Sequence, residues 1–132
     1  ENGIVVVVAA PGAACTPTSL NPSGNYGLTV YNVAFNTINS ATDPITSFPY
    51  TDYSCTRNTV VSRGSTYQLS ISITSGSASA EVFSAYIDYN NNNVFDTGEL
   101  VSSGTVTNGA TTVNANVTIP VTAVTGSLLR PS

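Results

Sequence analysis

The sequence contains no histidine, lysine, methionine or tryptophan, and only three arginines. With seven acidic residues, the net charge of the 132-residue chain is −4. Proteins that bind nucleic acids concentrate Lys and Arg against the phosphates, so this composition excludes nucleic acid as an expected partner and favours divalent cations. The missing His and Lys also remove the commonest general base and the amine that forms Schiff bases.

Long hydrophobic runs are scarce as well. The one continuous apolar stretch consists of Ile4, Val5, Val6, Val7 and Val8, followed by two alanines. A helix needs roughly 20 apolar residues to cross a bilayer, so we expect no membrane span. Because the stretch is apolar on both faces, it predicts a strand buried on both sides rather than one at an exposed sheet edge.

The abundant residues, among them Thr, Ser, Val and Asn, favour strands and turns in a single domain. The low charge fits an extracellular or cell-surface protein, and a chain that begins at Glu1 rather than Met fits removal of an export signal. In an oxidising setting Cys15 and Cys55 are expected to form a disulfide, which would stabilise the fold by roughly 3 to 4 kcal/mol. Two buried free thiols are the alternative.

Apolar and polar residues alternate in several segments, which is the pattern of strands with one buried face. The residues expected to point inward are Tyr67, Leu69, Ile71 and Ile73; Phe83, Ala85 and Ile87; and Val113, Ala115, Val117 and Ile119. Another strand begins at Leu28 and Val30 and runs towards Phe35. Turns are predicted at Gly64-Ser65, Ser75-Gly76-Ser77, Ser103-Gly104 and Asn108-Gly109, the last as a hairpin. These short strands predict an all-β fold, an antiparallel β-sandwich of the Ig-like or jelly-roll-like kind.

A longer irregular segment lies between Asn36 and Cys55 and contains the aromatic residues Phe48, Tyr50 and Tyr53. We expect this loop to cap one end of the sandwich, pinned by the disulfide. Packing within the loop is the first explanation for its aromatic rings, and stacking on carbohydrate is the second.

The segment from Asp88 to Glu99 carries the clearest chemical pattern. Oxygen side chains stand at positions 1, 3, 5, 9 and 12 of a twelve-residue loop, and the seventh position supplies a carbonyl; these residues are Asp88, Asn90, Asn92, Asp96, Glu99 and Val94. This is the spacing of an EF-hand calcium loop, whose sixth position needs a tight, often left-handed backbone. Asn93 replaces the usual glycine there. The sequence therefore predicts a Ca²⁺ site, and a solvated Asn-rich turn is the alternative.

One glycosylation sequon without a central proline is present, Asn116-Val117-Thr118. Alternation places Asn116 on the solvent face, opposite in direction to Val117. A glycan at Asn116 is therefore a candidate modification.

The chain resembles the GEVED family, whose members are β-sandwich modules of large secreted and cell-surface bacterial proteins. The residues that carry the resemblance are Cys15–Pro17, Tyr26–Val33 with Ile38-Asn39, Tyr50–Cys55, Gly64–Leu69, and Ala85–Asn90 leading to Phe95 and Glu99. In the last block Asp88 and Asn90 match the family pattern, whereas Asn92 and Asn93 stand where the family has Asp and Gly. The resemblance implies a non-catalytic structural or accessory module.

Three functions are compatible with these patterns. In the first, residues 1–14 form a strand and linker, and residues 15–132 form the sandwich. The strand Ile4–Val8 inserts into the next copy beside Leu128-Leu129, which gives a head-to-tail homopolymer. In the second, the strand folds back into its own domain, and the chain is a binding or spacer module of a larger secreted protein. The third is a hydrolase that uses Asp88, Asp96 and Glu99, although these carboxylates are better explained as metal ligands.

Overall fold

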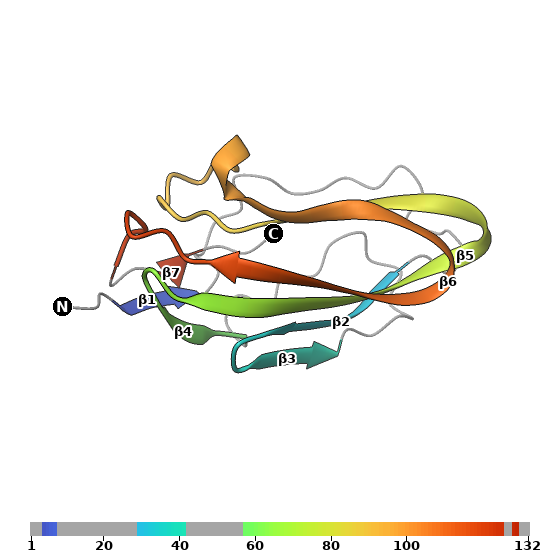
Figure 1. Cartoon of the computed structure of the whole chain (residues 1–132), viewed down its shortest axis with the longest axis horizontal. Coiled ribbons are helices and arrows are strands. Elements are labelled where there is room, and N and C mark those ends of the chain that lie inside the picture. The colour runs from blue at the N-terminus through green and yellow to red at the C-terminus, as the bar shows by residue number, and fades with distance from the viewer. Residues whose placement is uncertain (1–3, 8–28, 42–56, 126–127, 130–132) are drawn as a thin grey trace.

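A computed structural model describes residues 4–7, 29–41, 57–125 and 128–129 (Figure 1). Within these ranges the chain is all-β, with one antiparallel sheet, one mixed sheet, one short 3-10 helix and no α-helix. The elements in chain order are β1 (Ile4–Val7), β2 (Thr29–Phe35), β3 (Ile38–Ala41), β4 (Thr59–Ser62), β5 (Thr66–Tyr86), η1 (Thr97–Glu99), β6 (Leu100–Thr118) and β7 (Leu128–Leu129). The predicted all-β class and the strand leading to Phe35 are confirmed. The predicted disulfide partners Cys15 and Cys55 and the aromatic cluster lie outside the described residues.

The described strands form two sheets. The larger has the strand order β3-β2-β5-β6, and every neighbouring pair in it is antiparallel. The smaller has the order β4-β1-β7. The turn between β2 and β3 joins the two sheets, because the Asn36 side chain donates hydrogen bonds of 2.8 Å to the Thr59 hydroxyl and to the Val60 carbonyl in β4.

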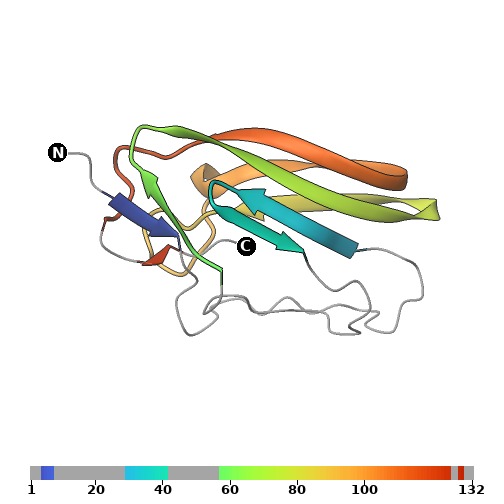
Figure 2. The same cartoon turned by 90° about the horizontal axis from the view of Figure 1, so that it is seen from below.

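β5 and β6 form one long ribbon that folds over on itself. They are paired from Thr66 opposite Thr118 to Tyr86 opposite Leu100, with a register shift between Ser75 and Ala80. Both strands turn back at the end of the molecule far from β1, so that the second half of the ribbon lies over the larger sheet (Figures 1 and 2). The loop that closes the ribbon is thereby returned to the end where the smaller sheet lies.

Three of the predicted turns are wrong, because Ser75-Gly76-Ser77, Ser103-Gly104 and Asn108-Gly109 lie inside β5 or β6. The glycines serve other purposes in the ribbon. Gly109 has a φ of +92°, which L-residues rarely adopt, and it lies opposite Ser75, beside the register shift of the ribbon. At Gly104 an added Cβ would lie 3.0 Å from the Phe83 ring, so glycine permits close packing. The turn at Gly64-Ser65 is confirmed, and Gly64 has a φ of +76°.

The inward-facing residues of the ribbon form the core together with residues of β2 and β4. The buried apolar residues are Phe35, Val61, Leu69, Ile71, Ile73, Ile87, Tyr89, Val106, Val117, Ile119 and Ala123. The predicted inward positions at Leu69, Ile71, Ile73, Ile87, Val117 and Ile119 are therefore confirmed. Of the other predicted positions, Tyr67, Phe83, Ala85 and Val113 are partly buried against this core, and Ala115 is half-buried. Val61 of the smaller sheet belongs to the same cluster as Leu69 and Ile71, so both sheets share one core.

In the first half of the ribbon, at residues 66–72 and 112–118, the outward positions carry uncharged polar side chains. The Thr66 and Thr118 hydroxyls are 2.8 Å apart, the Ser72 and Thr112 hydroxyls are 3.0 Å apart, and Asn116 is exposed, as alternation predicts. Hydroxyl and amide pairs directly opposite one another on a sheet surface stabilise strand pairing. The register of the ribbon is therefore stabilised by polar side-chain pairs on the outer face and by apolar packing on the inner face.

β1 lies at the centre of the smaller sheet. It pairs antiparallel with β4, Val6 lying opposite Val60, and parallel with β7, Val6 lying opposite Leu128. Ile4–Val7 is a central strand rather than an edge strand, as the sequence predicts, but it lies beside Leu128-Leu129 of its own chain and not of the next copy. Val8 lies outside the described residues. In this structure of one chain, β1 fills a place in its own sheet, which is the arrangement of the intramolecular alternative.

Replacing Ile119 by alanine should strongly destabilise the fold. Ile119 is 0 % exposed in the core, and Ile→Ala changes at such sites cost roughly 2 to 5 kcal/mol because a cavity remains. The control is Val121→Ala, since Val121 is 71 % exposed two residues along the chain. Denaturant unfolding should show a loss for Ile119→Ala and a change of no more than about 0.5 kcal/mol for the control; equal losses would contradict the assigned core.

Candidate functional site

The loop between β5 and β6 is fixed to the body of the domain at its base. The Ile87 amide donates to the Glu99 carbonyl at 2.9 Å, which closes the loop where the ribbon ends. The Val124 amide donates to the Tyr89 carbonyl at 2.9 Å, which ties the loop to the segment after β6. Because Ile87 and Tyr89 are both buried in the core, the loop starts from a rigid support.

Asp88, the first position of the predicted calcium loop, is 0 % exposed. Its two carboxylate oxygens accept hydrogen bonds from the Asn92 amide at 3.2 Å and the Asn93 amide at 2.9 Å. A carboxylate is buried at acceptable cost when backbone N–H groups replace its lost water. The chain is consequently curled around the Asp88 side chain.

Glu99, the twelfth position, is only 4 % exposed and accepts three backbone hydrogen bonds. Its Oε1 accepts from the Tyr89 amide at 2.9 Å and the Asn90 amide at 3.3 Å, and its Oε2 accepts from the Asp96 amide at 3.0 Å. The Glu99 side chain therefore links the two ends of the loop. Since each carboxylate oxygen has two lone pairs, Oε2 still has one for a further partner.

Three of the exposed polar side chains of the loop converge on one another. The Asn90 and Asn92 side-chain amides each donate to Oδ2 of Asp96 at 3.3 Å. The Asn90 Oδ1 accepts from the Asn92 amide at 2.9 Å, and the Asn92 Oδ1 accepts from the Val94 amide at 2.8 Å. These side chains thus also stabilise the turns of the loop itself, as expected for asparagine.

The backbone of the loop is left-handed at two asparagines. Asn93 has a φ of +66°, which confirms that the sixth position needs this conformation and that asparagine can take the place of glycine there. Asn91 has a φ of +56°, which the sequence analysis did not predict. The run of four asparagines at residues 90–93 could have predicted this left-handed backbone, because asparagine adopts the left-handed conformation more readily than other non-glycine residues.

The structure brings Asn90, Asn92 and Asp96 into mutual contact and turns Asp88 and Glu99 towards the loop backbone. No Lys or Arg lies between Asp88 and Glu99 to offset the three carboxylates. Among the described residues, no group of three or more His, Cys, Asp and Glu side chains lies close enough together to hold a metal ion. The donor chemistry still matches calcium, because every polar side chain of this cluster offers oxygen and none offers sulphur or imidazole.

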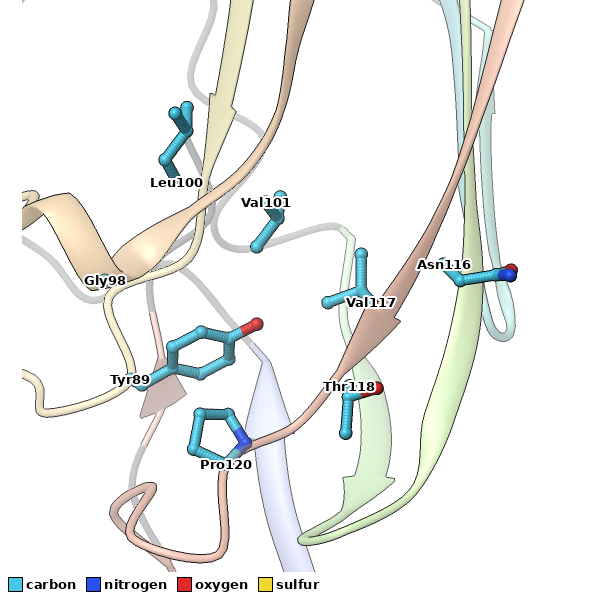
Figure 3. A pocket seen from close by; sticks show the side chains of 8 residues that line it. All are labelled: Tyr89, Gly98, Leu100, Val101, Asn116, Val117, Thr118 and Pro120. Carbon is cyan, nitrogen blue, oxygen red and sulfur yellow. The ribbon is translucent and has the colours of Figure 1, made fainter.

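A pocket beside the loop is shown in Figure 3. Its lining consists of Tyr89, Gly98, Leu100, Val101, Asn116, Val117, Thr118 and Pro120. The Tyr89 hydroxyl points towards Val117, whereas the Asn116 side chain points away from the pocket. Burial, followed by the negative charge of Glu99, raises the pKa of Tyr89 to about 12. The phenol is therefore held in its neutral form beside the acidic loop.

Comparison with known protein families connects the loop to one of them. The GEVED domain model matches residues 82–130. The recognition of this family is therefore confirmed over a stretch that contains the whole Asp88–Glu99 loop, and the earlier landmarks from Cys15 to Leu69 lie outside the matched residues. No curated protein and no solved structure matches the chain. In the part of the chain that the structure describes, no helix is long and apolar enough to cross a membrane.

Glu99→Gln should destabilise the fold even without metal. A glutamine amide offers N–H groups where the carboxylate accepts three backbone amides, so at least one buried donor loses its partner at a cost of roughly 1 to 3 kcal/mol. Asp96→Asn is the control, because Asp96 is exposed and its Oδ2 accepts only from side-chain amides. Chemical unfolding in EDTA should separate the two variants; equal stabilities would contradict the role of Glu99.

Alkaline pH should lower stability through Tyr89. The pKa of Tyr89 is raised from 10.0 to about 12 in the folded chain, so between these pH values the unfolded chain releases a proton that the folded chain keeps. The free energy of unfolding should be unaffected below pH 10 and should fall by about 2 to 3 kcal/mol by pH 12. Tyr89→Phe should remove that part of the decline. Unfolding curves of both proteins between pH 8 and pH 12 test this, and parallel profiles would refute it.

Proposed function

We propose that the chain is an extracellular structural subunit, a calcium-stabilised β-sandwich that polymerises head-to-tail by donation of the strand Ile4–Val8. The observation that carries this proposal is the position of β1 in the middle of the smaller sheet, between β4 and β7. A central strand bonds to neighbours on both sides, so its sheet depends on it. The same place can be filled by the identical strand of another copy with the same bonds, which is the basis of strand exchange between protomers.

The sandwich architecture is supported by the shared core of the two sheets and by the second half of the β5–β6 ribbon, which covers the larger sheet. Cys15 and Cys55 are proposed to form a disulfide that pins the loop following β3. The low charge, the absence of lysine and the match to the GEVED model support an extracellular or cell-surface location. We propose no catalytic role, and a glycan at the exposed Asn116 remains a candidate modification.

Calcium binding in the Asp88–Glu99 loop is supported by donor chemistry and backbone shape. Asp88, Asn90, Asn92, Asp96, Glu99 and the Val94 carbonyl are proposed as the ligands. Both buried carboxylates already lie at the correct ends of the loop, and Asn93 has the required left-handed backbone. A bound cation would offset the repulsion among three carboxylates that have no Lys or Arg in the same loop. For the amide oxygens of Asn90 and Asn92 to coordinate it, these side chains would rotate away from Asp96.

Calcium should raise the melting temperature and EDTA should reverse the effect. A ligand that binds only the folded state adds about 2.7 kcal/mol when its concentration is 100 times Kd. Asp96→Asn should weaken this response while leaving stability in EDTA nearly unchanged, because Asp96 is exposed. Glu81→Gln removes a carboxylate outside the loop and serves as the control. The melting temperatures of the unaltered chain and the two variants are measured with and without Ca²⁺. The absence of any calcium response in the unaltered chain would exclude the site.

A cysteine pair can decide whether β1 acts in trans. Val6 and Val60 lie opposite each other in β1 and β4, so Val6→Cys with Val60→Cys places two thiols in reach of one another. Strand donation predicts that oxidation links separate chains into covalent ladders on a denaturing gel. The intramolecular alternative, a binding or spacer module within a larger secreted adhesin or enzyme, predicts cross-linked monomers only.

Two controls accompany this experiment. Either cysteine substitution alone should give at most dimers, because one additional thiol per chain cannot extend a ladder. Deleting residues 1–10 should abolish head-to-tail polymers and leave unstable chains that recover stability when a synthetic peptide of that segment is added. Polymers that still form after the deletion would contradict a donor role for the strand.

A further inference from the structure

One edge of the larger sheet ends on an unusually regular strand. β6 is the last strand in the order β3-β2-β5-β6, with β5 on one side and no described strand on the other. Figure 2 shows this half of β6 along the outer margin of the molecule. A strand in this position presents a row of backbone N–H and C=O groups that can pair with another chain.

This edge lacks the features that usually discourage such pairing. Residues 112–118 contain no charged residue and no proline, and their pairing with β5 has no register shift. The other sheet edges are short: β3 and β4 have four residues each and β7 has two. β4 is also followed directly by Arg63. Edges are normally protected by shortness, charge, proline or bulges, and among the described strands this part of β6 has none of these.

The sequence of this edge reads the same in both directions. Residues 112–118 are Thr-Val-Asn-Ala-Asn-Val-Thr, a palindrome centred on Ala115. Two such strands running antiparallel about a twofold axis at Ala115 place every residue opposite one of its own kind. Thr112 then faces Thr118 of the other copy, Val113 faces Val117, and Asn114 faces Asn116. An isologous contact requires this kind of self-complementarity.

We propose that β6 is a homotypic interface, at which two copies of this chain pair antiparallel through residues 112–118 and join their larger sheets into one. On the outer face, Thr–Thr and Asn–Asn pairs cross the twofold axis and can form hydrogen bonds. They extend the existing ladder, in which the Ser72 and Thr112 hydroxyls are 3.0 Å apart and the Ser70 hydroxyl donates to Asn114 Oδ1 at 2.5 Å. On the inner face, the half-buried Val113 and Ala115 become covered by their counterparts.

A second copy is the partner that these residues fit best. Any extended peptide can satisfy the backbone groups of an edge strand, but the palindrome gives matched side chains on both faces only to this chain itself. Although the chain carries a net charge of −4, no charged residue lies within residues 112–118, so two copies approach here without directly opposed like charges. Because the contact is isologous, pairing of two copies occupies both edges and adds no further copy. It does not depend on β1, and in a polymer formed through β1 it would join two filaments side by side.

A charge-swap experiment on the full, unglycosylated chain tests this register. Asn114→Asp with Asn116→Asp places like charges opposite each other at both symmetry-related pairs, whereas Asn114→Asp with Asn116→Lys places opposite charges there. Among chains that have not polymerised through β1, sedimentation velocity should show a dimer for the unaltered sequence. Its dissociation constant should rise at least about 30-fold in the first double variant, because directly opposed like charges repel, and should recover in the second.

The matched control is Asn39→Asp with Ala41→Asp, which adds the same charge to exposed positions on β3 at the opposite edge of the sheet. This variant should dimerise like the unaltered chain, and melting temperatures should confirm that all variants fold. Species larger than dimers report on donation of β1 and are scored separately. The proposal is overturned if the unaltered chain is monomeric at millimolar concentration, if the β3 control dissociates equally, or if the Asp–Lys variant fails to recover the dimer.

Discussion

The backbone pairing between β5 and β6 is the constraint on which the rest of the molecule depends. It runs from Thr66 and Thr118 to Tyr86 and Leu100. The ribbon folds over on itself, and apolar residues of both halves, such as Ile71 and Val106, belong to one core. All of these pairs are nested around one loop, so closing that loop carries the loop-closure cost for the whole ribbon. The loop from Asp88 to Glu99 therefore matters structurally, because it is the turn that keeps the two strands in register.

Two buried carboxylates hold that turn together. Asp88 and Glu99 together accept five backbone hydrogen bonds within the loop, and such donors replace the hydration that a carboxylate loses on burial. Asp96 adds a third negative charge at the exposed side of the same loop. In the proposed account, a calcium ion bound by these three carboxylates offsets the repulsion among them. Metal binding therefore also stabilises the register of the ribbon.

The sequence predicted the faces of strands better than their lengths. Alternation placed Leu69, Ile71 and Ile73 inward correctly, because burial follows a period of two in any strand. It failed at Asn108-Gly109 because a short sequence cannot reveal whether a left-handed glycine ends a strand or bends a long one. In the loop, oxygen spacing located the residues that cluster and the left-handed Asn93. No sequence pattern predicted the contact of Val124, whose backbone amide donates a hydrogen bond to the Tyr89 carbonyl from a distant part of the chain.

Backbone amide NMR during a calcium titration tests the central claim most directly, because it reports on individual residues of the loop. The account predicts saturable shifts at the amides of residues 88–99, which contact Asp88, Glu99 and the asparagine side chains. Resonances from β2 and β3, in the larger sheet, should move much less. Unchanged loop amides at millimolar Ca²⁺, or shifts spread evenly over the acidic surface of the chain, would contradict a calcium site in this loop.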